Sequence, residues 1–213
     1  MPICVVLMVV LACGLCACGD PPAPHVPAAS LPGAGAPPAD PKTRARDLAE
    51  IMTTIVAAQN ANDGRTYLAA MHAFVPTRAE VRSLLREGPA TETFLAALKD
   101  TTVEDGLRDR RPPNAQQLPP TTRTEVTVHV ATTEELAAYE RGTVAFAEFP
   151  GGMKRFAREV AAPGRACYAV ELREPGHDSG TRITAFADLG DRFVLVAKPW
   201  RALPDEREAD EGP

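Results

Sequence analysis

The chain has 213 residues, of which 45% are hydrophobic and 24% are charged, and its formal net charge is −5. This composition is typical of a globular protein of ordinary size and excludes a disordered, collagen-like or polytopic membrane protein. The charges nearly cancel over residues 42–204, and the arginines at 108–111 are interrupted by an acid, so no nucleic-acid partner is expected. Two excesses remain: there are 21 prolines, and four of the five cysteines precede residue 19.

The first residues carry the pattern of a targeting signal. Residues 3–12 form an uncharged apolar run that is too short to span a bilayer and matches the hydrophobic region of a signal peptide. Residues 15–18 (LCAC) follow, and this order resembles the lipobox of bacterial lipoproteins, in which a cysteine after a small residue is lipidated. The resemblance implies a signal peptide over residues 1–17 and lipidation of Cys18, with Cys13 as the alternative. No basic residue precedes the run, which departs from the usual signal.

A spacer is predicted after the lipidated cysteine. Proline, alanine and glycine dominate residues 18–41, and such a composition favours extended conformations over a packed core. A lipid on Cys18 followed by a spacer predicts a domain anchored in the bacterial cell envelope, either at the outer membrane facing the periplasm or at the cell surface. The acidic residues 205–213 predict a disordered tail.

The domain, over residues 42–204, is predicted to begin with helices. Asp40 and Pro41 suit a helix start, and apolar side chains recur at helical spacing from Leu48 to Val56. Residues 60–64 end this helix. Three more helices are expected: one around Tyr67, one that opens with a capping box of Thr77 and Glu80 and ends at Gly88, and one from about Thr91.

After a proline-rich loop over residues 108–120, the pattern changes to strands. Apolar and polar side chains alternate over residues 125–130 and predict a strand, after which Thr132 and Glu135 form the capping box of a short helix. A second strand is predicted over residues 143–149, and a helix is predicted over residues 153–160. Turn sequences separate three closing runs and predict an antiparallel meander. These runs are residues 166–172, 181–187 and 192–198. The order of elements predicts an α+β domain in which N-terminal helices pack on a curved antiparallel sheet.

This order resembles the nuclear transport factor 2-like superfamily, also described as cystatin-like. The resemblance rests on a long first helix that ends in residues 62–64 (NDG), on residues 74–76 (FVP), and on a closing strand followed by Pro199 and Trp200. The loop at 108–120 and the helix after Gly152 depart from the pattern. The resemblance implies a cone-shaped pocket between sheet and helices, in a superfamily that holds both enzymes and binding modules.

Few residues are candidates for chemistry. The sequence contains no common catalytic, phosphate-binding or dinucleotide-binding motif, and neither a metal nor a cofactor is expected. The candidate pocket residues are His129, Tyr67, Tyr168 and Trp200, although filling a core is the commoner role of such aromatics. Glu125 is expected on the same strand face as His129. Cys167 has no disulfide partner within the domain and is expected to be a buried thiol.

Two functions are compatible with these features. The first is an envelope lipoprotein whose α+β domain binds a small apolar ligand or an envelope protein without catalysis. The second is a small isomerase or dehydratase that uses a cone-shaped pocket at His129. A closed apolar pocket with a desolvated carboxylate and histidine favours the enzyme, whereas a filled pocket favours an interaction module.

Overall fold

The structure is a computed structural model that describes residues 40–98 and 119–203. The predicted signal peptide, Cys13, Cys18, residues 18–39 of the spacer, most of the proline-rich loop and the acidic tail lie outside the described residues. The chain divides into two units, and every described residue belongs to the second, Pro32–Pro213. Over residues 40–98 and 119–203, none of the helices has both the length and the hydrophobicity needed to cross a membrane.

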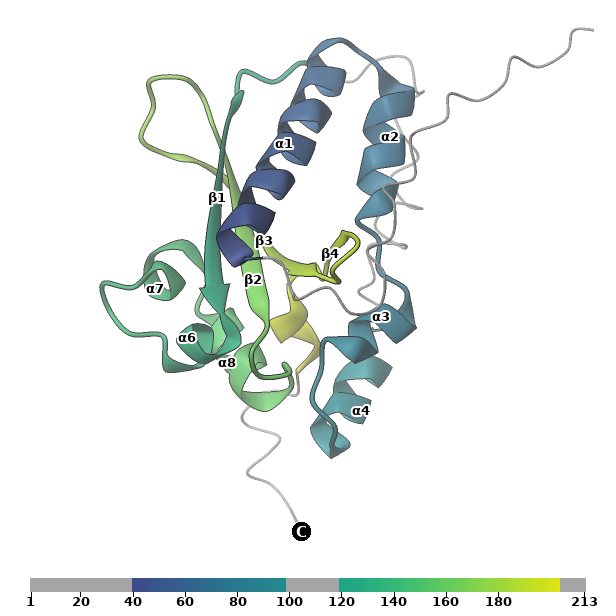
Figure 1. The fold of residues 1–213 in the computed structure, drawn as a ribbon, viewed down its shortest axis with the longest axis vertical. Coiled ribbons are helices and arrows are strands. Elements are labelled where there is room, and N and C mark those ends of the chain that lie inside the picture. The colour runs from purple at the N-terminus through teal and green to yellow at the C-terminus, as the bar shows by residue number, and fades with distance from the viewer. Residues whose placement is uncertain (1–39, 99–118, 204–213) are drawn as a thin grey trace, which may run out of the picture. The chain divides into compact units, whose positions relative to one another are not determined.

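Four antiparallel strands form one sheet in the order β1-β2-β3-β4 (Figure 1). They are β1 (Glu125–Thr132), β2 (Ala166–Arg173), β3 (Gly180–Asp188) and β4 (Phe193–Leu195). The register shifts between Tyr168 and Ala169, where β3 carries Ala185 as an extra residue with a φ of 74°. Such a bulge bends a strand and increases its twist. The strand predicted over residues 125–130 and the closing meander are confirmed, except that β4 is shorter than the predicted run.

Among the described residues, four helices precede the sheet. They are α1 (Pro41–Asn60), α2 (Gly64–Ala73), α3 (Arg78–Ser83) and α4 (Pro89–Ala97). The side chain of Asp40 accepts a hydrogen bond from the backbone N–H of Thr43 at 3.2 Å, and the predicted capping box of Thr77 and Glu80 is present. Gly88 does not end the third helix as predicted, because α3 stops at Ser83. With a φ of 148°, Gly88 instead lies at the N-cap of α4.

Short helices connect β1 to β2 and follow β4. They are α6 (Thr133–Ala138), α7 (Val144–Glu148), α8 (Gly152–Glu159) and the 3-10 helix η2 (Pro199–Ala202). The strand predicted over residues 143–149 is wrong, because this segment forms α7. Thr143 caps it by accepting a hydrogen bond from the N–H of Phe146 at 3.3 Å, and Ala145 and Phe149 enter the core. Alternating hydrophobicity over so few residues did not distinguish a single helical turn from a strand.

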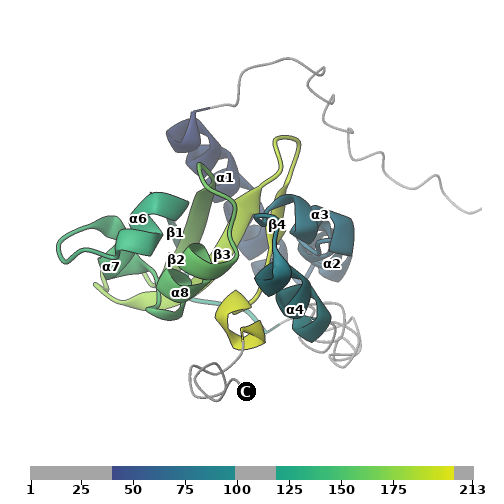
Figure 2. The same cartoon turned by 90° about the horizontal axis from the view of Figure 1, so that it is seen from below.

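Helices cover both faces of the sheet. Figure 2 shows the strands between α1 on one side and α8 with η2 on the other. On the face that we call the α1 face, α1 and the end of α2 pack on large side chains such as Tyr168, Phe186 and Phe193. On the opposite face, the α8 face, smaller strand residues such as Cys167 and Ala169 contact a core shared by α4, α6, α8 and η2. The described residues thus form an α+β domain with N-terminal helices on an antiparallel sheet, as predicted.

Two arginines tie the N-terminal helices to the sheet. Arg44 of α1 donates two hydrogen bonds to Asp188, at 2.8 and 2.7 Å, and its guanidinium lies 4.4 Å from the centre of the Phe193 ring. Arg192 donates to the Glu80 carboxylate of α3 at 3.1 and 2.6 Å. These hydrogen bonds hold the pKa of Glu80 down at about 2. Both ion pairs are part-buried, and each joins an N-terminal helix to a residue more than 100 positions later in the chain.

Candidate functional site

The α8 face changes from apolar to charged along the strands. At one end, Ala131 and Cys167 are buried in the core, whereas toward the other end the same strands carry His129 and Glu171. We define the His129 cluster as four side chains that meet there: His129 of β1, Glu171 of β2, Arg182 of β3 and Glu148 at the end of α7.

The strand register explains why these residues meet. Glu171 pairs with Thr127 on one side and with Arg182 on the other, while His129 pairs with Ala169. Side chains alternate between the two faces of a sheet, so His129 and Glu171 lie diagonally across neighbouring strands on one face. The helix α7 contacts β1, and this contact places Glu148 over the charged end of the face.

The distances within the cluster are short. His129 Nε2 lies 3.5 Å from Glu148 Oε2 and 3.5 Å from Glu171 Oε2. Arg182 Nη2 lies 2.8 Å from Glu148 Oε2 and 3.5 Å from Glu171 Oε1, and Nη1 donates a hydrogen bond to the carbonyl of Ala147 at 3.0 Å. One imidazole and two carboxylates therefore converge on a small volume, with the guanidinium at its outer side.

Burial makes this convergence costly unless the groups are well paired. The Glu171 side chain is only 8% exposed, His129 and Glu148 are 21% and 20% exposed, and Arg182 is 41% exposed. His129 Nε2 and Glu148 Oε2 are shielded from solvent, yet neither makes a hydrogen bond of regular geometry to any described residue. An unsatisfied buried polar atom costs about 1–3 kcal/mol, so such atoms are uncommon outside functional sites.

An imidazole and two carboxylates at this spacing support two kinds of chemistry. They can transfer protons as a general acid and base, or they can supply nitrogen and oxygen ligands to a divalent cation. The ligand atoms of His129, Glu148 and Glu171 all lie within 4.8 Å of one another. This is the one group of three such ligands in the part of the chain that the structure describes.

The structure does not bring the four predicted pocket residues together. Tyr67 and Tyr168 both pack in the core of the α1 face, where burial raises the pKa of Tyr168 to about 12. Trp200 packs on the α8-face core, beside Gly152. Only His129 lies in the charged cluster.

Two further residues singled out in the sequence lie outside the cluster. Glu125 is expected on the face of His129, but its carboxylate is exposed and lies 3.9 Å from the guanidinium of Arg173. Cys167 is a buried thiol, and burial raises its pKa to about 12, which leaves little of the reactive thiolate at neutral pH.

Sequence reasoning did not find the partners of His129. Glu171 had a signal, since it is a charged residue within an otherwise apolar strand run, and buried acids are rare unless paired. Glu148 was hidden by the wrong strand assigned to α7. Arg182 had no signal, because its approach to the other residues depends on how β2 and β3 pair.

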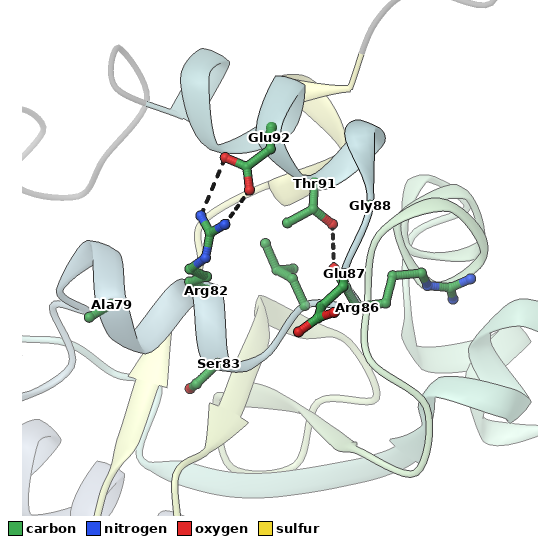
Figure 3. Close-up of a pocket in the computed structure, with 9 residues that line it drawn as sticks. Ala79, Arg82, Ser83, Arg86, Glu87, Gly88, Thr91 and Glu92 are labelled. Atoms are coloured by element: carbon green, nitrogen blue, oxygen red, sulfur yellow. Dashed lines mark hydrogen bonds and ion pairs between the residues drawn. The ribbon is translucent and has the colours of Figure 1, made fainter.

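Three hollows among the described residues lie apart from the cluster, and one of them, of about 370 Å³, lies between α1 and β1. A cleft of about 700 Å³ runs between α3 and α4, and an ion pair of Arg82 with Glu92 spans it (Figure 3). A cavity of about 20 Å³ lies in the α8-face core beside Cys167 and Met153, and this volume is too small for an organic ligand. The residues that line these three hollows do not include His129.

No family model, curated protein or solved structure matches this chain. The resemblance to the nuclear transport factor 2-like superfamily therefore stays a prediction from the order of elements.

Proposed function

We propose that the chain is a lipid-anchored protein of the bacterial cell envelope whose α+β domain is a non-catalytic binding module. One observation carries the proposal: an apolar run at residues 3–12 leads to the lipobox-like LCAC at residues 15–18 and then to a proline-rich spacer. Lipid on Cys18, or alternatively on Cys13, anchors the protein at the outer membrane or the cell surface. The helix α1 begins at Pro41, so the spacer leads directly into the folded part.

The packing of the domain supports binding without catalysis. The aromatic residues that were candidates for pocket walls belong to packed cores, with Tyr168 only 1% exposed. The helix α7, whose last residue Glu148 belongs to the His129 cluster, exposes the apolar side chains of Val144 and Phe146. Exposed apolar groups beside a polar cluster suit contact with an envelope protein or a small apolar ligand.

The second candidate function is a small isomerase or dehydratase. The observation in its favour is the placement of His129 between two partly buried carboxylates, which provides a general acid and base. Such an enzyme also needs a substrate-sized pocket that opens onto Nε2 of His129. A substrate screen in which Glu171→Gln removes turnover would favour this function over the binding module.

Mass spectrometry of the mature N-terminus tests the anchor, after expression of the full chain in bacteria with labelled palmitate. We expect cleavage before Cys18, a diacylated or triacylated N-terminus and a membrane-bound protein. Cys18→Ser should abolish labelling, whereas Cys16→Ser, a matched change within the same segment, should leave it intact. An uncleaved leader, or full membrane retention when both Cys13 and Cys18 are replaced by serine, would contradict the proposal.

A further inference from the structure

We infer that His129, Glu148 and Glu171 form a binding site for one divalent transition-metal ion, such as Zn²⁺ or Mn²⁺. The inference goes beyond the anchoring and binding role, and it holds whether or not the protein is lipidated. It departs from the expectation of no metal, because the three ligands come from β1, α7 and β2, and only the folded sheet brings them together.

The spacing of the ligand atoms fits such an ion. Zinc lies about 2.0–2.2 Å from histidine nitrogen and carboxylate oxygen, so two ligands at tetrahedral angles are about 3.4 Å apart. His129 Nε2 lies 3.5 Å from a carboxylate oxygen of Glu148 and also 3.5 Å from one of Glu171. The two carboxylate oxygens lie within 4.8 Å of each other, so a small rotation of one side chain completes the geometry.

The contacts that these three side chains make in the absence of an ion also support a metal site. Glu171 is more than nine-tenths buried on the sheet and faces His129 and Arg182 at 3.5 Å, which is too far for strong hydrogen bonds. His129 Nε2 is shielded and makes no regular hydrogen bond to a described residue, and Glu148 Oε2 is shielded with only the Arg182 guanidinium, at 2.8 Å, as its partner. A metal ion bonded to all three side chains satisfies these atoms together. Because β1 and β2 hold two of the ligands, the site is largely formed before the ion arrives.

Arg182 is the competitor for the ion. Its guanidinium contacts both carboxylates and supplies the positive charge that balances them in part. It is also the most exposed member of the cluster at 41%, so its long side chain can move into solvent when an ion enters. Two carboxylates match the charge of a divalent ion. The imidazole nitrogen favours Zn²⁺ or Co²⁺ over Mg²⁺ and Ca²⁺, which prefer oxygen ligands, while the two carboxylates also allow weaker binding of Mn²⁺.

Metal titration of the full chain, purified in detergent and stripped with a chelator, tests the inference. We expect one Zn²⁺ per chain by calorimetry. Co²⁺ should give visible d–d absorption without a sulfur-to-cobalt charge-transfer band, because no ligand is a thiolate. His129→Ala and Glu148→Gln should each weaken binding at least about 100-fold, since even residues that only orient ligands account for about 10–100-fold. Arg182→Ala should tighten it.

Matched controls separate this site from adventitious binding. Glu125→Gln changes an exposed acid on the same strand, and His177→Ala removes an exposed loop histidine, so neither should alter the affinity. If His129→Ala does not fold, as judged by circular dichroism, the near-isosteric Glu148→Gln decides. Four results would overturn the inference: no binding, a sulfur band, an affinity unchanged in Glu148→Gln, or weaker binding in Arg182→Ala. If the leader stays uncleaved, Cys4, Cys13, Cys16 and Cys18 remain in the chain, so the titration is then made on a variant with these four cysteines replaced by serine, and its outcome does not depend on lipidation.

Discussion

The two faces of the sheet use the same strands in opposite ways. On the α1 face, successive outward positions of β2 carry Tyr168 and Val170, both buried in a continuous apolar core. On the α8 face, the same strand carries the buried Cys167 near its start and the charged Glu171 four residues later. One step along β2, from Val170 to Glu171, therefore passes from a packed core to the His129 cluster.

This difference separates stability from function within one sheet. The α1 face supplies packed apolar area, which is the dominant stabilising contribution in folding. The charged half of the α8 face holds charged and polar groups that are partly buried, and burial of such groups costs free energy that their contacts with Arg182 offset only in part. The stability supplied by the α1 face offsets the cost of keeping the His129 cluster. Such an arrangement is common where binding needs preformed polar groups.

The largest effect is expected from a truncation on the α1 face. Phe186 is fully buried, and its ring packs edge-on against Phe74 with centroids 5.1 Å apart. Phe186→Ala should lower the free energy of unfolding by about 3–5 kcal/mol, through lost burial and the cavity left behind. Urea unfolding followed by circular dichroism measures this change. A loss below about 1 kcal/mol would show that the α1 face is not the stabilising core.

A pair of glycines tests the packing of the apolar half of the α8 face. A Cβ on Gly152 would overlap the indole of Trp200, whereas a Cβ on Gly151 would come no closer than 3.9 Å to Tyr139 Oη. Gly152→Ala should therefore cost about 1–3 kcal/mol, and Gly151→Ala should cost almost nothing. Thermal melts of the two variants make the comparison. Equal melting temperatures would show that the Trp200 side chain moves aside at no cost and that the apolar half of the α8 face is loosely packed.

The pH dependence of stability tests the ion pair of Glu80 with Arg192, which unlike the His129 cluster has full hydrogen bonds. The pKa of Glu80 falls from 4.5 to about 2 on folding, so the pair stabilises the folded state above pH 4.5. This stability is lost as the pH falls from about 4.5 toward 2. We expect the ion pair to contribute about 1–2 kcal/mol to the free energy of unfolding, because solvent screens side chains that are partly exposed.

The matched variant for this prediction is Glu80→Gln, which keeps the capping box but removes the charge. Urea unfolding between pH 6 and pH 3 should show that the free energy of unfolding of the wild type exceeds that of the variant at pH 6, and that this difference shrinks as the pH falls. A constant difference over this range would contradict the assignment of the pKa to the ion pair.

The smallest effect is expected in the charged cluster itself. Glu148→Gln replaces one of two neighbouring carboxylates with a neutral group of the same size, so like-charge repulsion is relieved while the contact with Arg182 weakens. Without added metal, the free energy of unfolding should change by less than about 1 kcal/mol. Urea unfolding in the presence of a chelator checks this. A loss of 3 kcal/mol or more would mean that the cluster is a stabilising ion-pair network.

The fold could be predicted from the sequence because its signals are local. The stripe from Leu48 to Val56, the capping boxes at Thr77 and Thr132, and the alternation of β1 and β2 each depend on residues a few positions apart. The errors arose where a local pattern was too short. The segment at residues 143–149 holds one turn of helix, and Gly88 stands between two helices and suits either the end of one or the start of the next.

The candidate site could be predicted only in part. His129 stood out as a histidine on the polar face of a strand, but its role depends on Glu148, Glu171 and Arg182, which approach it through strand register and through the position of α7. Tyr168 and Trp200 were candidates as rare aromatics, and the structure uses both in packing. Residue type alone does not show which neighbours a side chain acquires in the fold.

The measurement that tests the central claim most directly is paramagnetic broadening of backbone amide signals by Mn²⁺ in the full chain. The claim is that the charged half of the α8 face binds an ion while the α1 face serves stability. Signals near His129 and Glu171 and those of α7 should therefore broaden first and saturate at one ion per chain, while signals of α2 persist. Broadening confined to the acidic residues 205–213, or as strong in α2 as in α7, would contradict the claim.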